Sequence, residues 1–120
     1  MKKVLLVNTN QETNPYPVPP LGLCLVAGVL SGEYEVRLFD GTFTGTSGLA
    51  ETLEAFKPDY VGVTIRNIDD MDILDPTRYL EPIRDTFIKT IRKHSRAPLI
   101  LGGSAFSIFP EFLVALFGAD

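Results

Sequence analysis

The residues whose types and spacing could do chemistry begin with a pair of glycines. Gly102 and Gly103 directly follow the apolar run 99–101. Two residues without a Cβ let a flat ligand approach the main chain, or let the chain adopt positive φ. Hydroxyls and rings come next, a mixture that suits a large, mostly apolar ligand with a few polar handles: Ser104, Phe106, Ser107 and Phe109. A simple turn, with the two rings in the core, is the alternative.

Three weaker signals lie elsewhere in the chain. The aspartates within residues 69–75 could supply oxygens to a hard cation, but they lack the spacing and the glycine of a calcium loop, which favours a solvated loop. Cys24, the one cysteine, lies among leucine and valine and is expected to be a small buried hydrophobe. His94, the one histidine, is expected to cap a helix end or to be exposed.

The elements that must position these residues alternate between strands and helices. Apolar runs predict strands at 3–7, 35–39, 60–65 and 99–101. Apolar spacing and end signals predict helices at 21–30, at 49–56, from 80 to 91 with a kink or a break at Pro82, and at 110–117. Almost every residue of 21–30 is apolar or small, so this helix is expected to be covered on most sides.

This alternation predicts an α/β fold, a flavodoxin-like or Rossmann-like three-layer sandwich with a parallel sheet. Ligands of such sheets bind at the carboxyl ends of the strands. The loops 8–20, 65–75 and 102–109 are expected to meet there. We treat residues 1–120 as one domain with four strands, and we expect the fifth strand of the fold to begin about where the sequence ends, as in a fragment of a longer enzyme.

Other ligands of this fold class fit less well. Residues 42–47 resemble the hydroxyl-rich phosphate loop of flavodoxins, but that loop must follow the first strand, and here it follows the second. A phospho-receiver domain needs acidic residues after the first strand and an aspartate after the third, and neither is present. A net charge of −4 without a basic run disfavours nucleic acid and anionic membranes. The apolar stretches are too short for membrane insertion, which is consistent with a cytoplasmic protein.

Three segments in order carry a resemblance to a known family. They are Val-Leu-Leu-Val-Asn at 4–8, Pro-Pro-Leu-Gly-Leu at 19–23 and Leu-Gly-Gly-Ser at 101–104. Together they resemble the N-terminal cobalamin-binding domain of cobalamin-dependent radical S-adenosylmethionine proteins, over essentially the whole chain. Segments 64–69 and 103–111 resemble a subgroup often labelled as lipid-biosynthesis proteins. In that family the cysteines that bind the iron-sulfur cluster come after the equivalent of Asp120.

The resemblance implies a cofactor module without a catalytic centre of its own. Its partners would be cobalamin and the radical domain of the same full-length chain, which would hold the iron-sulfur cluster and S-adenosylmethionine. Methyl transfer or related radical chemistry is then expected of the full-length protein. The resemblance leaves the substrate and the oligomeric state open.

The resemblance also implies how the cofactor is held. The methionine synthase type of domain carries a cobalt-ligating histidine after the first strand, and residues 8–22 contain no histidine. Cobalamin is therefore expected to bind without a histidine ligand, its nucleotide tail beside the first, third and fourth strands. The implied contacts are Thr9, Asn10, Leu21, Gly22, Thr64, Arg66, Asn67, Gly102, Gly103 and Ser104. Arg66 or Asn67 could approach the lower face of the corrin. An FMN-binding domain and a ligand-free docking domain are the alternatives.

Overall fold

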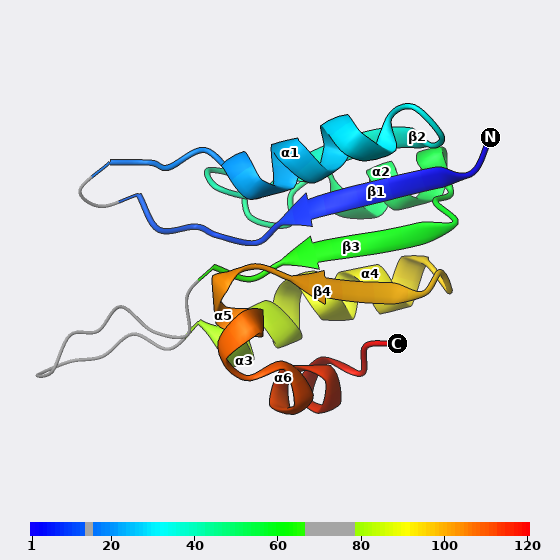
Figure 1. The fold of residues 1–120 in the computed structure, drawn as a ribbon. Helices are drawn as coiled ribbons and strands as arrows, with labels where there is room; N and C mark the ends of the chain where they lie inside the picture. Colours follow the sequence, from blue (N-terminus) through cyan, green and yellow to red (C-terminus); the bar gives the residue numbers. More distant parts are fainter. Residues whose placement is uncertain (14–15, 67–78) are drawn as a thin grey trace, which may run out of the picture.

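The computed structural model describes residues 1–13, 16–66 and 79–120, and within them a single parallel sheet crosses the molecule (Figure 1). Its strands are β1 (Lys3–Asn8), β2 (Glu35–Asp40), β3 (Tyr60–Thr64) and β4 (Leu99–Gly102). The order across the sheet is β2-β1-β3-β4. The predicted α/β class and parallel sheet are confirmed, with strand ends shifted by one residue. Asn67 and the aspartates within 69–75 lie outside the described residues.

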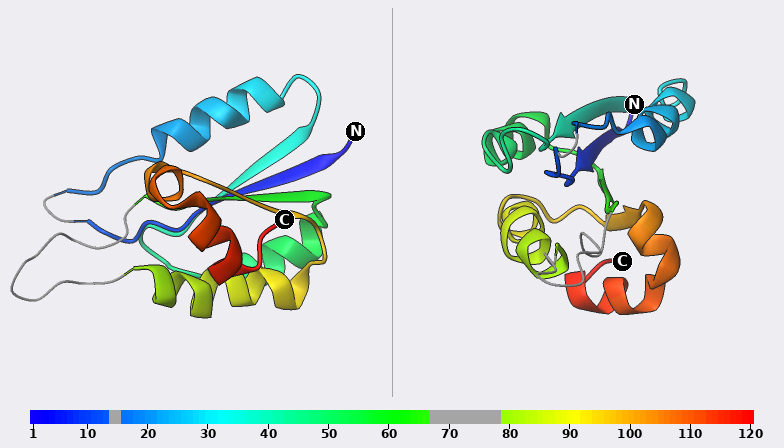
Figure 2. Two further views of the ribbon diagram at one scale, coloured as in Figure 1. Left: turned by 60° about the horizontal axis from the view of Figure 1, so that its bottom comes forward. Right: turned by 90° about the vertical axis from the view of Figure 1, so that its left-hand side faces the viewer.

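Helices lie on both faces of the sheet, which gives three layers (Figure 2). On one face lie α2 and the run from α3 to α4, and on the other lie α1 and α5, while α6 packs beyond β4. The bounds are α1 (Leu21–Leu30), α2 (Leu49–Phe56), α3 (Leu80–Ile83), the π-helix η1 (Arg84–Ile88), α4 (Lys89–His94), α5 (Ser104–Ile108) and α6 (Pro110–Phe117).

The core lies between the sheet and the layer of α2, η1 and α4. Successive side chains of a strand point to opposite faces. Leu5, Val7, Val61 and Leu99 belong to one face, and all four are buried to 2% exposure or less. They share a single apolar cluster with Phe87 of η1. Burying a side chain of this size stabilises a fold by about 1.5–3 kcal/mol, so this layer anchors the sheet.

The helix with Pro82 is continuous rather than broken. Leu80 to His94 form three consecutive pieces, α3, η1 and α4. Pro82 is the third helical residue, where an N–H would have no partner within the helix, so its missing donor has little effect there. The Pro82 carbonyl accepts a hydrogen bond from the Thr86 hydroxyl at 2.6 Å, in the π-helical turn that follows.

Two expectations about α1 were wrong. None of its ten residues is buried, and Cys24 is exposed. The helix packs on β1 and β2 only through a narrow inner side, on which Leu23, Ala27 and Leu30 are half-buried. An apolar composition predicts that a helix buries its side chains. The elements that pack on the helix determine how much of it is buried.

The expected loop 102–109 was also wrong. Residues 104–108 form α5, which starts immediately after Gly103. The amide of Ala105 donates to the carbonyl of Ile65 at 3.0 Å, which ties this helix to the end of β3. Phe106 packs against the core, whereas Phe109 is 52% exposed.

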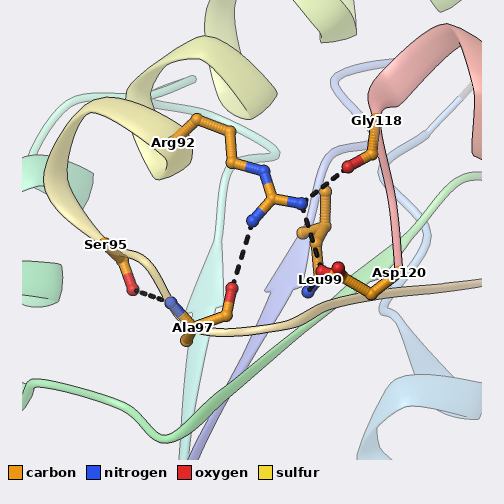
Figure 3. Close-up of polar contacts among 6 residues, drawn as sticks. All are labelled: Arg92, Ser95, Ala97, Leu99, Gly118 and Asp120. Atoms are coloured by element: carbon orange, nitrogen blue, oxygen red, sulfur yellow. Dashed lines mark hydrogen bonds and ion pairs between the residues drawn. The ribbon is translucent and has the colours of Figure 1, made fainter.

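Arg92 lies at the centre of a group of hydrogen bonds beside the start of β4 (Figure 3). Arg92 donates from Nη1 to the Ala97 carbonyl at 3.2 Å and from Nη2 to the Gly118 carbonyl at 2.6 Å and to Asp120 Oδ2 at 3.2 Å. The same Oδ2 accepts the Leu99 amide at 2.8 Å, and the Asp120 amide donates back to the Leu99 carbonyl at 3.0 Å. The Leu99 amide, and after it Arg92, hold the pKa of Asp120 below its ordinary value of 3.8.

Replacing Arg92 is expected to destabilise the fold. Arg92→Ala removes the donor to three acceptors and should lower the free energy of unfolding by about 1 kcal/mol or more, measured by urea denaturation at pH 7. Arg84→Ala is the matched control, because the ion pair of Arg84 with Asp85 is exposed and should contribute almost nothing. An equal loss in both variants would contradict this role for Arg92.

The contribution of Asp120 should depend on pH. A carboxyl with a lowered folded-state pKa stabilises the fold above its unfolded pKa and loses that effect as the pH falls through the folded value. Asp120→Asn should therefore be less stable than the parent chain at pH 7, with the difference shrinking below about pH 3.8. A constant difference between pH 7 and pH 2.5 would show that ionisation of Asp120 is not involved.

Candidate functional site

The main pocket lies between α1 and the sheet face that the core does not use. Its volume is about 610 Å³. Eight of the ten predicted contacts line it: Asn10, Leu21, Gly22, Thr64, Arg66, Gly102, Gly103 and Ser104. Asn67 is outside the described residues. The carboxyl ends of β1, β3 and β4 therefore do meet at one cavity, as a parallel sheet requires.

Thr9 has a different position from the one expected. It is buried to 2% exposure and is not among the lining residues. Its hydroxyl donates to the main-chain carbonyl of Thr64 at 2.8 Å. Thr9 thus ties the end of β1 to the end of β3 and holds the pocket wall rather than facing a ligand.

Strand register arranges the pocket in two rows across the sheet. Leu6, Gly62 and Ile100 are aligned in one row. Asn8, Thr64 and Gly102 form the next row toward the carboxyl edge. The loop residues Asn10 and Arg66 and the first residue of α5, Ser104, follow beyond that edge. On the sheet, the pocket is therefore apolar toward the middle and polar toward the carboxyl edge, where Val18, Pro19 and Pro20 of the loop before α1 also line it.

Sequence reasoning missed the lining residues that precede the strand ends. Leu6, Gly62 and Ile100 line the pocket but were treated only as parts of strands, and Asn8 was placed in the loop 8–20 without being named as a contact. The alternation of side chains along each strand could have found them, because residues two apart point to the same face. Val26 and Leu23 of α1 were missed because they looked like core residues.

Gly103 allows two elements to meet at the pocket rim. Its φ is 99°, and a Cβ at this position would collide with the Ile65 carbonyl and lie 2.7 Å from Thr64 Oγ1. Only glycine adopts this conformation at no steric cost. Of the two alternatives given for the glycine pair, the need for positive φ therefore applies at Gly103. At Gly102, a Cβ would meet nothing within 4 Å.

A buried polar network orients the rim beside β1. The Asn8 amide donates from Nδ2 to Asp40 Oδ1 at 2.9 Å and to Thr42 Oγ1 at 3.3 Å. Asp40 Oδ1 also accepts the hydroxyl of Thr42 at 2.6 Å. Asn8 Oδ1 in turn accepts the amide of Asn10 at 3.3 Å, and Asn10 Oδ1 accepts the amide of Glu12 at 3.2 Å. Asp40 therefore determines which way the Asn8 amide faces, and Asn8 supports Asn10.

This network keeps Asp40 ionised. Partial burial raises the pKa of its carboxyl, but hydrogen bonds from the Thr42 hydroxyl, the Asn8 amide and the Thr42 main-chain amide outweigh it. The net pKa lies below the ordinary value of 3.8. Charge-assisted hydrogen bonds of this kind are stronger than neutral ones.

Comparison with known proteins assigns the family. Residues 10–120 match the model of the B12 binding domain. The chain belongs to the B12-binding domain family. It is 31% identical over 121 residues to the tryptophan 2-C-methyltransferase of Streptomyces laurentii, which covers 98% of this chain and 20% of that protein.

Solved structures of a related methyltransferase have the same fold over the whole of this chain. The chain resembles the radical S-adenosylmethionine methyltransferase TsrM from Kitasatospora setae with tryptophan and the analogue aza-SAM bound, with a TM-score of 0.88 and 32% identity. It resembles TsrM with cobalamin and a [4Fe-4S] cluster bound with a TM-score of 0.86 and 32% identity. Both matches cover 100% of this chain and 22% of the other. This B12-binding domain thus spans about a fifth of these relatives and is homologous to the N-terminal region of TsrM.

The loop that resembles a flavodoxin phosphate loop has other partners in this B12-binding domain. Thr42 is buried, and both its hydroxyl and its main-chain amide donate to Asp40. A carboxylate at the position of a phosphate would repel it. The loop follows β2, an edge strand, and does not line the pocket. These contacts and the family assignment favour cobalamin over FMN.

His94 lies far from the pocket rim. It ends α4, and its Nδ1 is 2.8 Å from Glu54 Oε1, beside a second hollow of about 450 Å³ at the opposite edge of the sheet. Within residues 1–13, 16–66 and 79–120 no group of three His, Cys, Asp or Glu side chains could hold a metal ion. In the same part of the chain no helix is both long and apolar enough to cross a membrane.

Removing the Asp40 carboxylate is expected to loosen the rim. In Asp40→Ala, the amides of Asn10 and Glu12 should exchange hydrogen faster, because Asn8 is no longer held in place. Asp59→Ala is the matched control: Asp59 accepts the Lys3 amide at 2.8 Å, at the other end of β1. Amide exchange measured by NMR should separate the two, and unchanged protection of Asn10 in Asp40→Ala would refute the proposed role.

Proposed function

We propose that this domain binds cobalamin, without a histidine ligand to cobalt, as the cofactor module of a radical S-adenosylmethionine methyltransferase. The observation that carries the proposal is the pocket, which opens at the carboxyl edge and is lined there by glycines and small polar residues. The family assignment and the TsrM structure with cobalamin bound support the same ligand.

The pocket fits part of the cofactor. A volume of about 610 Å³ is in the range of drug-sized ligands, which is too small for a complete corrinoid and suits its nucleotide tail. The corrin ring would then lie outside, across the loop tips. Asn10, Thr64 and Ser104 would supply hydrogen bonds to the polar parts of the tail at the rim. Bound cobalamin would supply a cobalt centre able to carry a methyl group.

The proposal that no histidine ligates cobalt rests on the positions of His94 and Arg66. The one histidine of the chain is paired with Glu54 beside the second hollow. Arg66 is exposed, follows β3 at the carboxyl edge and lines the pocket. The Arg66 guanidinium, a cation that does not ligate metals, would therefore lie beside bound cobalamin. The radical domain of the same full-length chain is the proposed partner, since the relatives are about five times as long.

Blocking the pocket should weaken binding without loss of the fold. Gly22 and Gly28 both lie on α1, and a Cβ at either meets nothing within 4 Å, but only Gly22 lines the pocket. Leucine at either position should slightly stabilise the helix. Gly22→Leu should weaken hydroxocobalamin binding at least about tenfold, because overpacking costs about 1–3 kcal/mol. Gly28→Leu should leave the affinity, measured by absorbance titration, unchanged.

These two variants also test the location of the site. Equal affinities in Gly22→Leu and Gly28→Leu would move the cofactor away from this pocket. A titration with FMN in parallel separates the flavin alternative, and binding of neither compound would favour the docking domain.

Replacing Arg66 should change the absorbance spectrum of the bound cofactor. In Arg66→Ala, the absorbance spectrum of bound cobalamin should shift, because the positive charge beside the cofactor would be lost. Arg96→Ala is the control, since Arg96 lines only the second hollow. If spectrum and affinity both match those of the parent chain, Arg66 does not approach the cobalt.

A further inference from the structure

The chain after β1 is held at several points along the carboxyl edge of the sheet. The Thr9 hydroxyl donates to the Thr64 carbonyl at 2.8 Å, on the side of β3. Two turns closed by asparagine side chains overlap here, since Asn8 Oδ1 accepts the Asn10 amide at 3.3 Å and Asn10 Oδ1 accepts the Glu12 amide at 3.2 Å. Asn10 is 9% exposed and lines the pocket from this segment.

A tyrosine from another element holds the far end of this segment. The Tyr79 hydroxyl donates to Glu12 Oε2 at 2.8 Å, between residues 67 positions apart in the chain. Tyr79 directly precedes α3, and its side chain packs against the apolar core. Since α3 lies on the core side of the sheet, this hydrogen bond ties the loop after β1 to the helices of that layer (Figure 1).

The contact with Glu12 also fixes which end of the Asn10 side chain a ligand can meet. A main-chain N–H can only donate, so the Asn10 atom beside the Glu12 amide must be the carbonyl oxygen. The NH₂ group is then the end left for a ligand. Asn10 would donate to an acceptor of the cofactor, such as a phosphate or amide oxygen. Once the bond to Glu12 is lost, the carboxamide is free to turn and present its oxygen instead.

We propose that Glu12 and Tyr79 are positioning residues of the cobalamin site, whose hydrogen bond holds the loop so that Asn10 presents its NH₂ group to the pocket. The inference rests on the proposed cobalamin site and gives a role to two residues that do not themselves line the pocket. A donor that is already in place binds a ligand more tightly, because the ligand does not have to order it.

Loss of one hydroxyl tests the contact. Tyr79→Phe keeps the ring and should weaken hydroxocobalamin binding about fivefold, as the loss of one hydrogen bond does. Tyr60→Phe is the matched control, because Tyr60 is also half-buried but begins β3, at the amino edge and outside the pocket. It should leave the affinity, measured by absorbance titration, unchanged. In the cofactor-free chain, NMR should show faster hydrogen exchange of the Glu12 amide in Tyr79→Phe but not in Tyr60→Phe.

Further variants separate positioning from general stability. Glu12→Gln keeps an oxygen acceptor and should bind hydroxocobalamin almost as tightly as the parent chain, whereas Glu12→Ala should lose as much affinity as Tyr79→Phe. In the Asn10→Ala background, Tyr79→Phe should have no further effect on affinity, because no carboxamide is left to position. A purely structural role would instead weaken binding by the same factor in both backgrounds.

The outcomes separate this inference from the proposed function. Failure of the parent chain to bind hydroxocobalamin would overturn both. Binding by the parent chain and by Tyr79→Phe with equal affinity would overturn the inference and leave cobalamin binding intact. An equal loss from Tyr79→Phe with and without the Asn10 side chain, or unchanged exchange of the Glu12 amide in Tyr79→Phe, would also overturn it.

Discussion

The unequal covering of the two faces of the sheet is the constraint on which the rest of the structure depends. One face is sealed by α2, η1 and α4, with Leu5, Val61 and Leu99 fully buried. That burial supplies the stabilisation that holds four parallel strands together. On the other face α1 packs on β1 and β2, and the row from Leu6 to Ile100 remains open as the pocket. A stable core on one side thus permits a binding surface on the other.

Glycines serve two distinct purposes around this surface. Gly103 is required by packing, since its φ is 99° and a Cβ there would collide with the Ile65 carbonyl, whereas a Cβ at Gly62 would meet only the tip of the Leu6 side chain. Gly22 and Gly102 have open space around them and line the pocket. Their open surroundings leave room at the pocket wall.

The polar rim is organised from outside the pocket. Asp40 does not line it, yet it orients Asn8 and, through Asn8, the loop that carries Asn10. Its lowered pKa keeps the carboxylate charged, so the network is maintained over the ordinary range of pH. On the opposite side of the rim, Gly103 and Ala105 join β3 to α5. Both devices hold the strand ends in register, as a preformed site requires.

The sequence by itself determined the strands, the order of the elements, the family resemblance and eight of the lining residues, because local periodicity and the ends of parallel strands are readable from residue types. It could not show that α1 lies exposed, that Cys24 faces outward or that Thr9 turns into the wall, since each depends on which neighbours cover a side chain. Alternation along the strands can place Leu6, Gly62 and Ile100 on one face, but only the tertiary structure decided that this face lines the pocket. Their side of the sheet follows from register and from the helices that cover the opposite face.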